Sequence, residues 1–247
     1  MTLAISQANE LPRGVAWFTD QPLTVDGVLD EPAWQRAPVL RFSAASAEDG
    51  ETRMLWSAEG LYVTFSAVER TPVLGYAKAG EPVYREDAFE LFVDQAGDHR
   101  QYYEVQVSAS GQVFVKCYVL TEAPRLNAEG WLTRDFIDRC LWRYDVPAPE
   151  SLRVASRLDA QSGRWTLELF VPAELVNRRF GGALQPRAWR VNITRHDWDL
   201  PPAVAQRRGR FLYWAPVYAG HPHLSPTLMG YLELSYENAK LQKPKSN

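Results

Sequence analysis

The sequence predicts an all-β fold, a jelly-roll-like antiparallel β-sandwich with one or two short helices. Three observations predict it: short runs alternate apolar and polar residues along the 247-residue chain, turn residues separate these runs, and helix signals are sparse. Nine runs are expected to form strands: 52–57, 61–68, 88–94, 101–108, 112–119, 152–158, 164–171, 188–195 and 228–235.

Turn signals separate neighbouring runs. The segments "AEG" at 58–60, "ASG" at 109–111 and "AQSG" at 160–163 each end in glycine, which favours hairpin turns. No internal repeat, low-complexity tract or linker interrupts the chain. We therefore expect one domain over residues 20–237, with an N-terminal extension at 1–19 and a polar tail at 238–247.

Two segments carry helix signals. "LDEPAWQRA" offers Asp30 as an N-cap with Pro32 in the first turn, and "VPAELVNRRF" is expected to form two helical turns. The stretch 120–150 follows no regular pattern, and we expect it to form a long surface excursion.

Charge and targeting signals limit the partners. The 27 basic and 30 acidic residues give a net charge of -3, so neither nucleic acid nor a membrane surface is an expected partner. No apolar stretch reaches the length of a membrane span. The N-terminus shows no signal peptide, which predicts a cytoplasmic protein if the chain is complete and a secreted or periplasmic one if a leader was removed. Cys117 and Cys140 are either one disulfide or two small buried side chains.

The familiar catalytic motifs are absent from the sequence. It contains no glycine-rich phosphate loop, CxxC pair, HExxH or GxSxG. His221 and His223 alternate as two metal ligands would, but no third ligand is apparent, which favours a solvated loop fixed by two prolines. No catalytic residue is predicted, although two acids that folding brings together from separate strands stay an alternative.

The run at 88–94 raises the main question of function, because an acid lies in the middle of a strand. Phe89, Leu91 and Val93 share one face, whereas Glu90 lies on the other between Ala88 and Phe92. A half-buried carboxylate needs hydrogen-bond donors. Two sources fit equally: the hydroxyls of a bound sugar, or a buried ion pair with an arginine of a neighbouring strand, Arg190 or Arg195.

Acids at the ends of this strand invite a different interpretation. Asp87 and Asp94 are typical of turn or cap residues or of calcium ligands, and they are the acidic candidates for a metal site.

Eight segments then follow one another between about residues 20 and 235: "LTVDGVLDEPAW", "TRMLWSAEGLYVTFSAVE", "REDAFELFVD", "YYEVQVSASGQV", "RWTLELFVPAEL", "AWRVNITR", "YWAP" and "PTLMGYLEL". In this order they resemble a family 9 carbohydrate-binding module, which is similar to the broader DOMON-like sandwiches. The resemblance covers nearly the whole chain. It implies a noncatalytic protein that binds a sugar or a polysaccharide end and serves the breakdown of polysaccharides such as xylan or cellulose beside a separate glycoside hydrolase.

The resemblance also implies a binding site. A terminal sugar would lie between the rings of Tyr84 and His223, with Glu90 and Gln106 holding its hydroxyl groups and Trp214 close to the pocket. Tyrosine and histidine replace the two large rings of the usual clamp, and glutamine replaces the usual arginine. Structural calcium is the one cofactor that the resemblance adds, although "SAVERT" lacks the family's aspartate at that point.

Two further functions are compatible with such a sandwich. One is a haem-binding electron-transfer subunit, for which Met54 and Met229 are the available methionines, and the other is a scaffold that has lost its sugar site. Among the remaining aromatic residues, Trp198 and Tyr218 lie in loops, at the pocket rim or buried by those loops. Four tryptophans are expected in the core: Trp34, Trp56, Trp165 and Trp189.

Overall fold

The structure is a computed structural model that describes residues 11–42, 46, 48–127, 132–217 and 220–236. The strands are β1 (Arg13–Phe18), β2 (Val39–Arg41), β3 (Glu51–Ser57), β4 (Gly60–Val68), β5 (Ala88–Asp94), β6 (Gln101–Ser108), β7 (Val113–Leu120), β8 (Leu141–Asp145), β9 (Arg153–Asp159), β10 (Arg164–Pro172), β11 (Arg187–Trp198), β12 (Gly209–Tyr213) and β13 (Gly230–Ser235). The helices are α1 (Pro32–Arg36), α2 (Arg134–Cys140) and α3 (Ala173–Val176), with short 3-10 turns η1 (Pro222–Leu224) and η2 (Pro226–Leu228).

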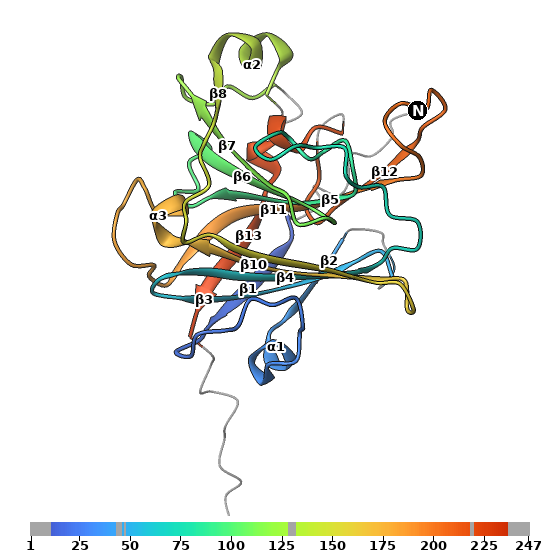
Figure 1. Ribbon diagram of the computed structural model, residues 1–247. Helices are drawn as coiled ribbons and strands as arrows, with labels where there is room; N and C mark the ends of the chain where they lie inside the picture. The colour runs from blue at the N-terminus through green and yellow to red at the C-terminus, as the bar shows by residue number, and fades with distance from the viewer. Residues whose placement is uncertain (1–10, 43–45, 47, 128–131, 218–219, 237–247) are drawn as a thin grey trace, which may run out of the picture.

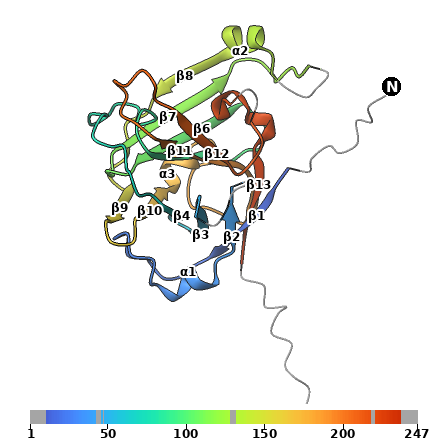
Figure 2. The same ribbon diagram turned by 90° about the vertical axis from the view of Figure 1, so that its right-hand side faces the viewer.

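These strands form one hydrogen-bonded sheet that curls back on itself into two layers. Its order is β8-β7-β6-β5-β11-β13-β1-β3-β4-β10-β9, with β12 paired to β11 and β2 paired to β3. In Figure 1, β7, β6, β5 and β11 form the upper layer, and β10, β4, β3 and β1 form the lower one. Figure 2 shows the same layers from the side, with α2 above and α1 below them. The predicted β-sandwich is confirmed.

All nine predicted strands are present, but the sheet also contains strands that the sequence did not predict. The segment 120–150 is not a purely irregular excursion, because it holds α2 and the edge strand β8. The Thr133 side chain caps α2 by accepting a hydrogen bond from the backbone N–H of Phe136. β8 then pairs antiparallel with β7. Its Trp142 and Tyr144 are exposed, so the strand lacks the one-sided burial that a sequence pattern reveals.

β1 also departs from the sequence expectation. It lies inside the segment 1–19 that the sequence sets apart as an extension, yet it pairs with both β13 and β3. Both pairings are parallel, whereas the expected sandwich is antiparallel throughout. β1 therefore forms the seam between the two layers.

The core lies between the layers and is rich in aromatic residues. Trp165 packs edge to face on Phe65 at 4.8 Å between ring centroids, and Phe65 lies 5.2 Å from Phe89 of the upper layer. The prediction of four core tryptophans is confirmed, because each is at most 2% exposed: Trp34, Trp56, Trp165 and Trp189.

The segment "DGVLDEPAW" is fixed to the lower layer by one buried acid. Glu168 of β10 accepts hydrogen bonds from the backbone N–H groups of Asp26 at 2.9 Å and Gly27 at 2.8 Å, and from Trp34 Nε1 at 3.0 Å. α1 begins within this segment, at Pro32, with Glu31 rather than the predicted Asp30 at its N-cap. The second predicted helix is α3, and it is a single turn.

Cys117 and Cys140 are both buried and free, so they form no disulfide with each other. In the described ranges, no helix is both long and apolar enough to cross a membrane.

Candidate functional site

A pocket of about 540 Å³ opens on the outer face of the upper layer. Its floor comes from β5 and β6, one wall from β11 and β12, the opposite wall from β7 and β8, and its rim from the loops that precede β5 and β13. The residues around it are Pro82, Tyr84, Glu90, Glu104, Gln106, Lys116, Tyr118, Arg143, His196, Trp198, Phe211, Tyr213, Gly220, His221, Pro222 and His223.

Strand β5 is buried on both faces, which explains why an acid can sit at its centre. Phe89, Leu91 and Val93 enter the core between the layers. On the outer face, Phe92 packs in a second cluster that includes residues of α2 and Met229. Glu90 lies on the same outer face, only 2% exposed, at the bottom of the pocket.

The protein itself supplies two partners for Glu90. Thr194 and Glu90 are directly opposite each other on β11 and β5, and the Thr194 hydroxyl donates to Glu90 Oε2 at 2.8 Å. His196 lies two residues further along β11, and its Nε2 is 3.2 Å from the same oxygen. The described residues provide no hydrogen-bond donor for the other oxygen, Oε1.

The predicted alternative of an arginine partner for Glu90 is therefore wrong. Arg195 alternates onto the opposite face of β11, where its Nη2 lies 2.9 Å from Glu69 Oε2. Arg190 donates to the Thr227 carbonyl at 2.9 Å and lies over the ring of Tyr231. Sequence alternation separates the faces of β11, but only the register with β5 selects Thr194 and His196.

Glu90 and His196 form a buried ion pair. Burial opposes ionisation of Glu90, but the charge and hydrogen bond of His196 outweigh it and lower the pKa of Glu90. Burial likewise opposes protonation of His196, yet the Glu90 carboxylate raises the pKa of His196. His196 Nδ1 also lies 3.3 Å from the Tyr84 carbonyl oxygen, so the imidazolium donates to both acceptors. The ring thereby connects the pocket floor to the rim loop.

A second acid shares the floor. Glu104 of β6 accepts hydrogen bonds from Gln106 Nε2 at 2.6 Å and from the hydroxyl of Tyr118. Burial, with the nearby charge of Glu90, raises the pKa of Glu104 to about 7. Because Gln106 is the residue opposite Glu90, Glu104 is the diagonal neighbour of Glu90 on the same sheet face. The two acids rise side by side from one floor.

Gln106 is committed to the protein rather than free for a ligand. Its amide oxygen accepts from the backbone N–H of Val83 at 3.0 Å, while its amide nitrogen donates to Glu104. It therefore ties the loop that carries Tyr84 to the floor.

Tyr84 stands at the rim with 42% of its surface exposed. Its carbonyl oxygen also accepts a hydrogen bond from Trp198 Nε1 at 3.0 Å. Phe211 of β12 packs edge to face on Trp198 at 5.1 Å and on His196 at 4.9 Å. The backbone of Tyr84 is thus bound to Trp198 and His196, and Phe211, which the sequence did not point to, packs on both of these rings.

His223 lines the pocket from η1, on the side of β7. Its ring is stacked on Tyr118 at 6.0 Å between centroids, and Tyr118 is stacked on Tyr102 at 4.9 Å. Burial lowers the pKa of His223 to about 4, so the ring is neutral near pH 7. Of the five predicted binding residues, the structure gathers four around one pocket: Tyr84, Glu90, Gln106 and His223.

The fifth candidate, Trp214, lies elsewhere. It is 6% exposed, belongs to the core cluster, and does not line the pocket. Asn192 shares the face of Glu90 but is bound to the backbone of Ala215, so neither it nor Arg195 reaches the pocket. Trp198 does line the rim, whereas Tyr218 lies outside the described residues.

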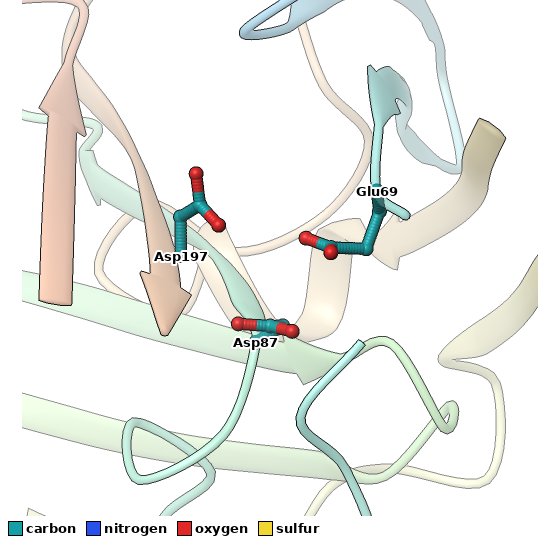
Figure 3. A group of neighbouring side chains, drawn as sticks. All are labelled: Glu69, Asp87 and Asp197. Carbon is teal, nitrogen blue, oxygen red and sulfur yellow. The ribbon is translucent and has the colours of Figure 1, made fainter. Parts of the chain in front are cut away.

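A separate group of acids lies near the pocket wall that β11 and β12 form. Glu69 follows β4, Asp87 precedes β5 and Asp197 lies on β11, and Figure 3 shows the three carboxylates pointing toward one another. One oxygen of each lies within 4.8 Å of the others. Burial first, then the neighbouring charges of Glu69 and Asp197, raise the pKa of Asp87 to about 7.

The acids of this group fit a cation only in part. Asp87 already accepts backbone hydrogen bonds on both oxygens, from Val73 at 2.6 Å and Trp198 at 2.7 Å. The guanidinium of Arg195, 2.9 Å from Glu69 and 3.6 Å from Asp197, supplies positive charge. Calcium requires six to eight oxygen ligands, so these residues would need further oxygens to hold it. Calcium binding at Asp87 stays a prediction.

The other sequence candidates for metal or cofactor binding lie apart. Asp94 accepts from the backbone N–H groups of Gly97 and His99, both at 2.8 Å, as a turn residue does. Met54 and Met229 are fully buried in different hydrophobic clusters, and neither lines the pocket.

Comparison with known proteins adds family evidence. The model of the "Carbohydrate family 9 binding domain-like" family matches residues 25–115. No curated protein matches the chain.

Solved structures match over nearly the full length. A family 9 carbohydrate-binding module from Caldicellulosiruptor kristjanssonii in complex with cellotriose is 14% identical with a TM-score of 0.59, covering 96% of this chain and 100% of that one. A candidate carbohydrate-binding protein from Bacteroides uniformis is 13% identical with a TM-score of 0.65, covering 91% and 100%. A Caldicellulosiruptor kristjanssonii family 9 module in complex with glucose is 12% identical with a TM-score of 0.56, covering 92% and 98%.

At 12–14% identity, the solved structures establish the fold only. The family model, in contrast, is matched by the amino-acid sequence of residues 25–115. Residues 25–115 thus match the carbohydrate family 9 binding domain-like model, and the sandwich as a whole has the fold of family 9 carbohydrate-binding modules.

Proposed function

We propose that the protein is a noncatalytic carbohydrate-binding module that holds the end of a mono- or oligosaccharide in the pocket above Glu90. One observation carries this proposal: a carboxylate with an oxygen free of protein donors lies at the bottom of an open pocket whose rim presents the exposed ring of Tyr84. Sugars combine hydroxyl donors with apolar C–H faces, and the pocket offers a partner for each.

Recognition would rely on groups that are already in place. Thr194 and His196 fix one oxygen of Glu90, which leaves Oε1 to accept from a sugar hydroxyl in a charge-assisted hydrogen bond. The ring of Tyr84 would stack on a sugar face. Because the Tyr84 loop is tied down through Gln106, His196 and Trp198, binding would cost little ordering entropy.

The arrangement of the two acids favours binding over hydrolysis. A glycosidase places its carboxyl groups on either side of the scissile bond. Glu90 and Glu104 instead stand on neighbouring strands of one floor, with Glu104 hydrogen-bonded to Tyr118 and Gln106. The role in biology would be to assist polysaccharide breakdown beside a separate glycoside hydrolase.

The test is titration calorimetry with glucose, cellobiose, xylobiose and galactose against the wild type and the variants Tyr84→Ala and Glu90→Gln. We expect saturable binding to at least one sugar, with Kd of order micromolar to millimolar, and a loss of about tenfold or more in each variant. Tyr144→Ala is the matched control, because Tyr144 is a tyrosine on β8 with 48% exposure that does not line the pocket.

Thermal unfolding of every variant checks that the fold is intact. Wild-type protein that gives no saturable heat with any sugar, neutral or acidic, would refute the proposal. So would a Tyr84→Ala variant that binds as tightly as Tyr144→Ala.

A further inference from the structure

One wall of the pocket carries two basic side chains. Lys116 lies on β7 and Arg143 on the edge strand β8, and both line the pocket. In the register of these strands, Tyr118 is opposite Arg143 and Lys116 is opposite Asp145. Lys116 and Arg143 are therefore diagonal neighbours on the sheet face that bears Glu104 and Tyr118.

Arg143 is a cation without a partner. It is exposed, and within the described part of the chain it makes neither a hydrogen bond nor an ion pair. Lys116 has one acidic neighbour, Asp145 at 3.5 Å, whose side chain is 69% exposed. Such an exposed pair is weak. The wall thus presents donors that are available to a ligand.

The acids of the floor do not cancel this charge. Glu90 is compensated by His196, to which it is paired at 3.2 Å. Glu104 has a pKa raised to about 7, chiefly by burial, and so carries only part of a charge near neutral pH. Lys116 and Arg143 thus leave the pocket with an excess of positive charge along one wall.

We propose that the preferred ligand is an acidic saccharide, one whose terminal sugar is a uronic acid, with its carboxylate bound by Arg143 and Lys116. The inference rests on the proposed function, because it names the class of sugar that the same pocket would take. The guanidinium offers two parallel N–H donors that match a carboxylate, and Lys116 adds a point charge beside it.

A carboxylate fits this pocket better than a phosphate. A sugar phosphate carries close to two negative charges at neutral pH. Asp145, 3.5 Å from Lys116, offsets one of the two positive charges of the wall, so the remaining charge matches a monoanion better than a dianion. The wall supplies charge for one negative group, and the floor keeps its acceptors for neutral hydroxyls.

The experiment compares matched sugars by titration calorimetry: glucose with glucuronate, galactose with galacturonate, and glucose 6-phosphate. We expect the uronate of the preferred pair to bind about tenfold more tightly than its neutral counterpart and more tightly than the phosphate. Raising the salt from about 20 to 500 mM should remove most of this difference, because salt screens exposed charges.

Variants locate the effect. Arg143→Gln and Lys116→Gln should each reduce uronate binding severalfold while leaving the neutral sugar within about twofold. Arg139→Gln is the control, since Arg139 is an exposed arginine of α2 outside the pocket and the change removes the same charge.

The outcomes separate the two proposals. Equal affinity for neutral and acidic sugars would overturn this inference and leave the proposed function standing, and so would a uronate preference that survives in Arg143→Gln. Tighter binding of glucose 6-phosphate than of glucuronate would overturn the carboxylate assignment. The absence of binding to all five ligands would refute the proposed function as well.

Discussion

Glu90 and His196 form the pair on which the pocket floor depends. One oxygen of Glu90 is shared by Thr194 and His196, and His196 also contacts the Tyr84 carbonyl. Removing the imidazole would take away the positive charge that compensates the buried Glu90 carboxylate. It would also remove the hydrogen bond to the Tyr84 carbonyl, which helps to hold the rim loop. A buried charge that loses its partner costs more than the pair itself contributes.

The His196→Gln variant tests this pair through pH. The pKa of His196 is raised, so the stabilisation it brings is complete below the ordinary histidine value and is lost as pH rises through the folded value. The pKa of Glu90 is lowered, so its contribution is present above the ordinary glutamate value and is lost as pH falls. We expect His196→Gln to lower the free energy of unfolding by about 1–3 kcal/mol at pH 5.5 and by less at pH 9.

Urea unfolding at both pH values measures the effect of His196→Gln. His221→Gln, a change at the pocket rim, serves as the control. An equal loss of stability at pH 5.5 and pH 9 would show that the charge of His196 is not what matters.

At the scale of elements, Glu168 of β10 joins the "DGVLDEPAW" segment and α1 to the sheet. Its carboxylate takes three donors, two backbone N–H groups and the indole of Trp34, and the side chain is 1% exposed. Glu168→Ala would leave these donors without a partner. We therefore expect a loss of about 2–4 kcal/mol in the free energy of unfolding, measured in urea.

Glu233→Ala is the comparison for Glu168→Ala, since Glu233 occupies a similar mid-strand position on β13 but is exposed. It should change stability by less than about 0.5 kcal/mol. Similar losses in the two variants would mean that the bonds to Glu168 contribute little.

The elements that the sequence predicted correctly share one property. β5, β6 and β10 alternate or are wholly buried, so apolar periodicity and flanking turns reveal them. β8 was not predicted because its residues after Leu141 are exposed, and β12 was not predicted because it is short and half-buried. β1 was not predicted because its parallel partners, β13 and β3, are remote from it in the sequence.

The site shows the same division. Glu90 was found because an acid in the middle of a strand conflicts with burial, and Tyr84 and His223 were placed by resemblance. His196 and Phe211 were missed, because only the register of β11 with β5 and β12 brings them to the pocket. Pairing between strands that are far apart in the sequence depends on the packing of the whole sheet, so the spacing of residues within one strand does not predict it.

At the scale of the molecule, buried acids should shape the dependence of stability on pH. The pKa values of Asp87 and Glu104 are both raised to about 7, mainly by burial. The folded state therefore holds protons that the unfolded state has lost, and stability decreases as pH rises from about 4 to 7. Asp49 and Asp98 have lowered pKa values, so their contributions are lost in acid.

We expect stability to be highest near about pH 4–5, to decline as pH rises to about 7, and to be lower at pH 8.5. The variant Glu104→Gln removes one of the two raised acids and should be more stable than wild type at pH 8.5, by an amount on the order of 1–3 kcal/mol, with a smaller difference at pH 5.5. Thermal unfolding across this range measures both effects. A wild-type profile that is flat between pH 6 and 8.5 would contradict the raised pKa values.

The parallel seam of β1 and β13 has a consequence for how the protein can be attached to a support or to another domain. Because Arg13 lies opposite Tyr231 and Trp17 opposite Ser235, the chain enters the seam at one end and leaves it at the other. The entry end is the one where η1 and η2 lead into β13 and His223 lines the pocket. A surface, label or neighbouring domain joined after Tyr236 would thus attach at the end of the seam opposite η1 and η2, whereas one joined before Pro12 would attach at the same end as these turns.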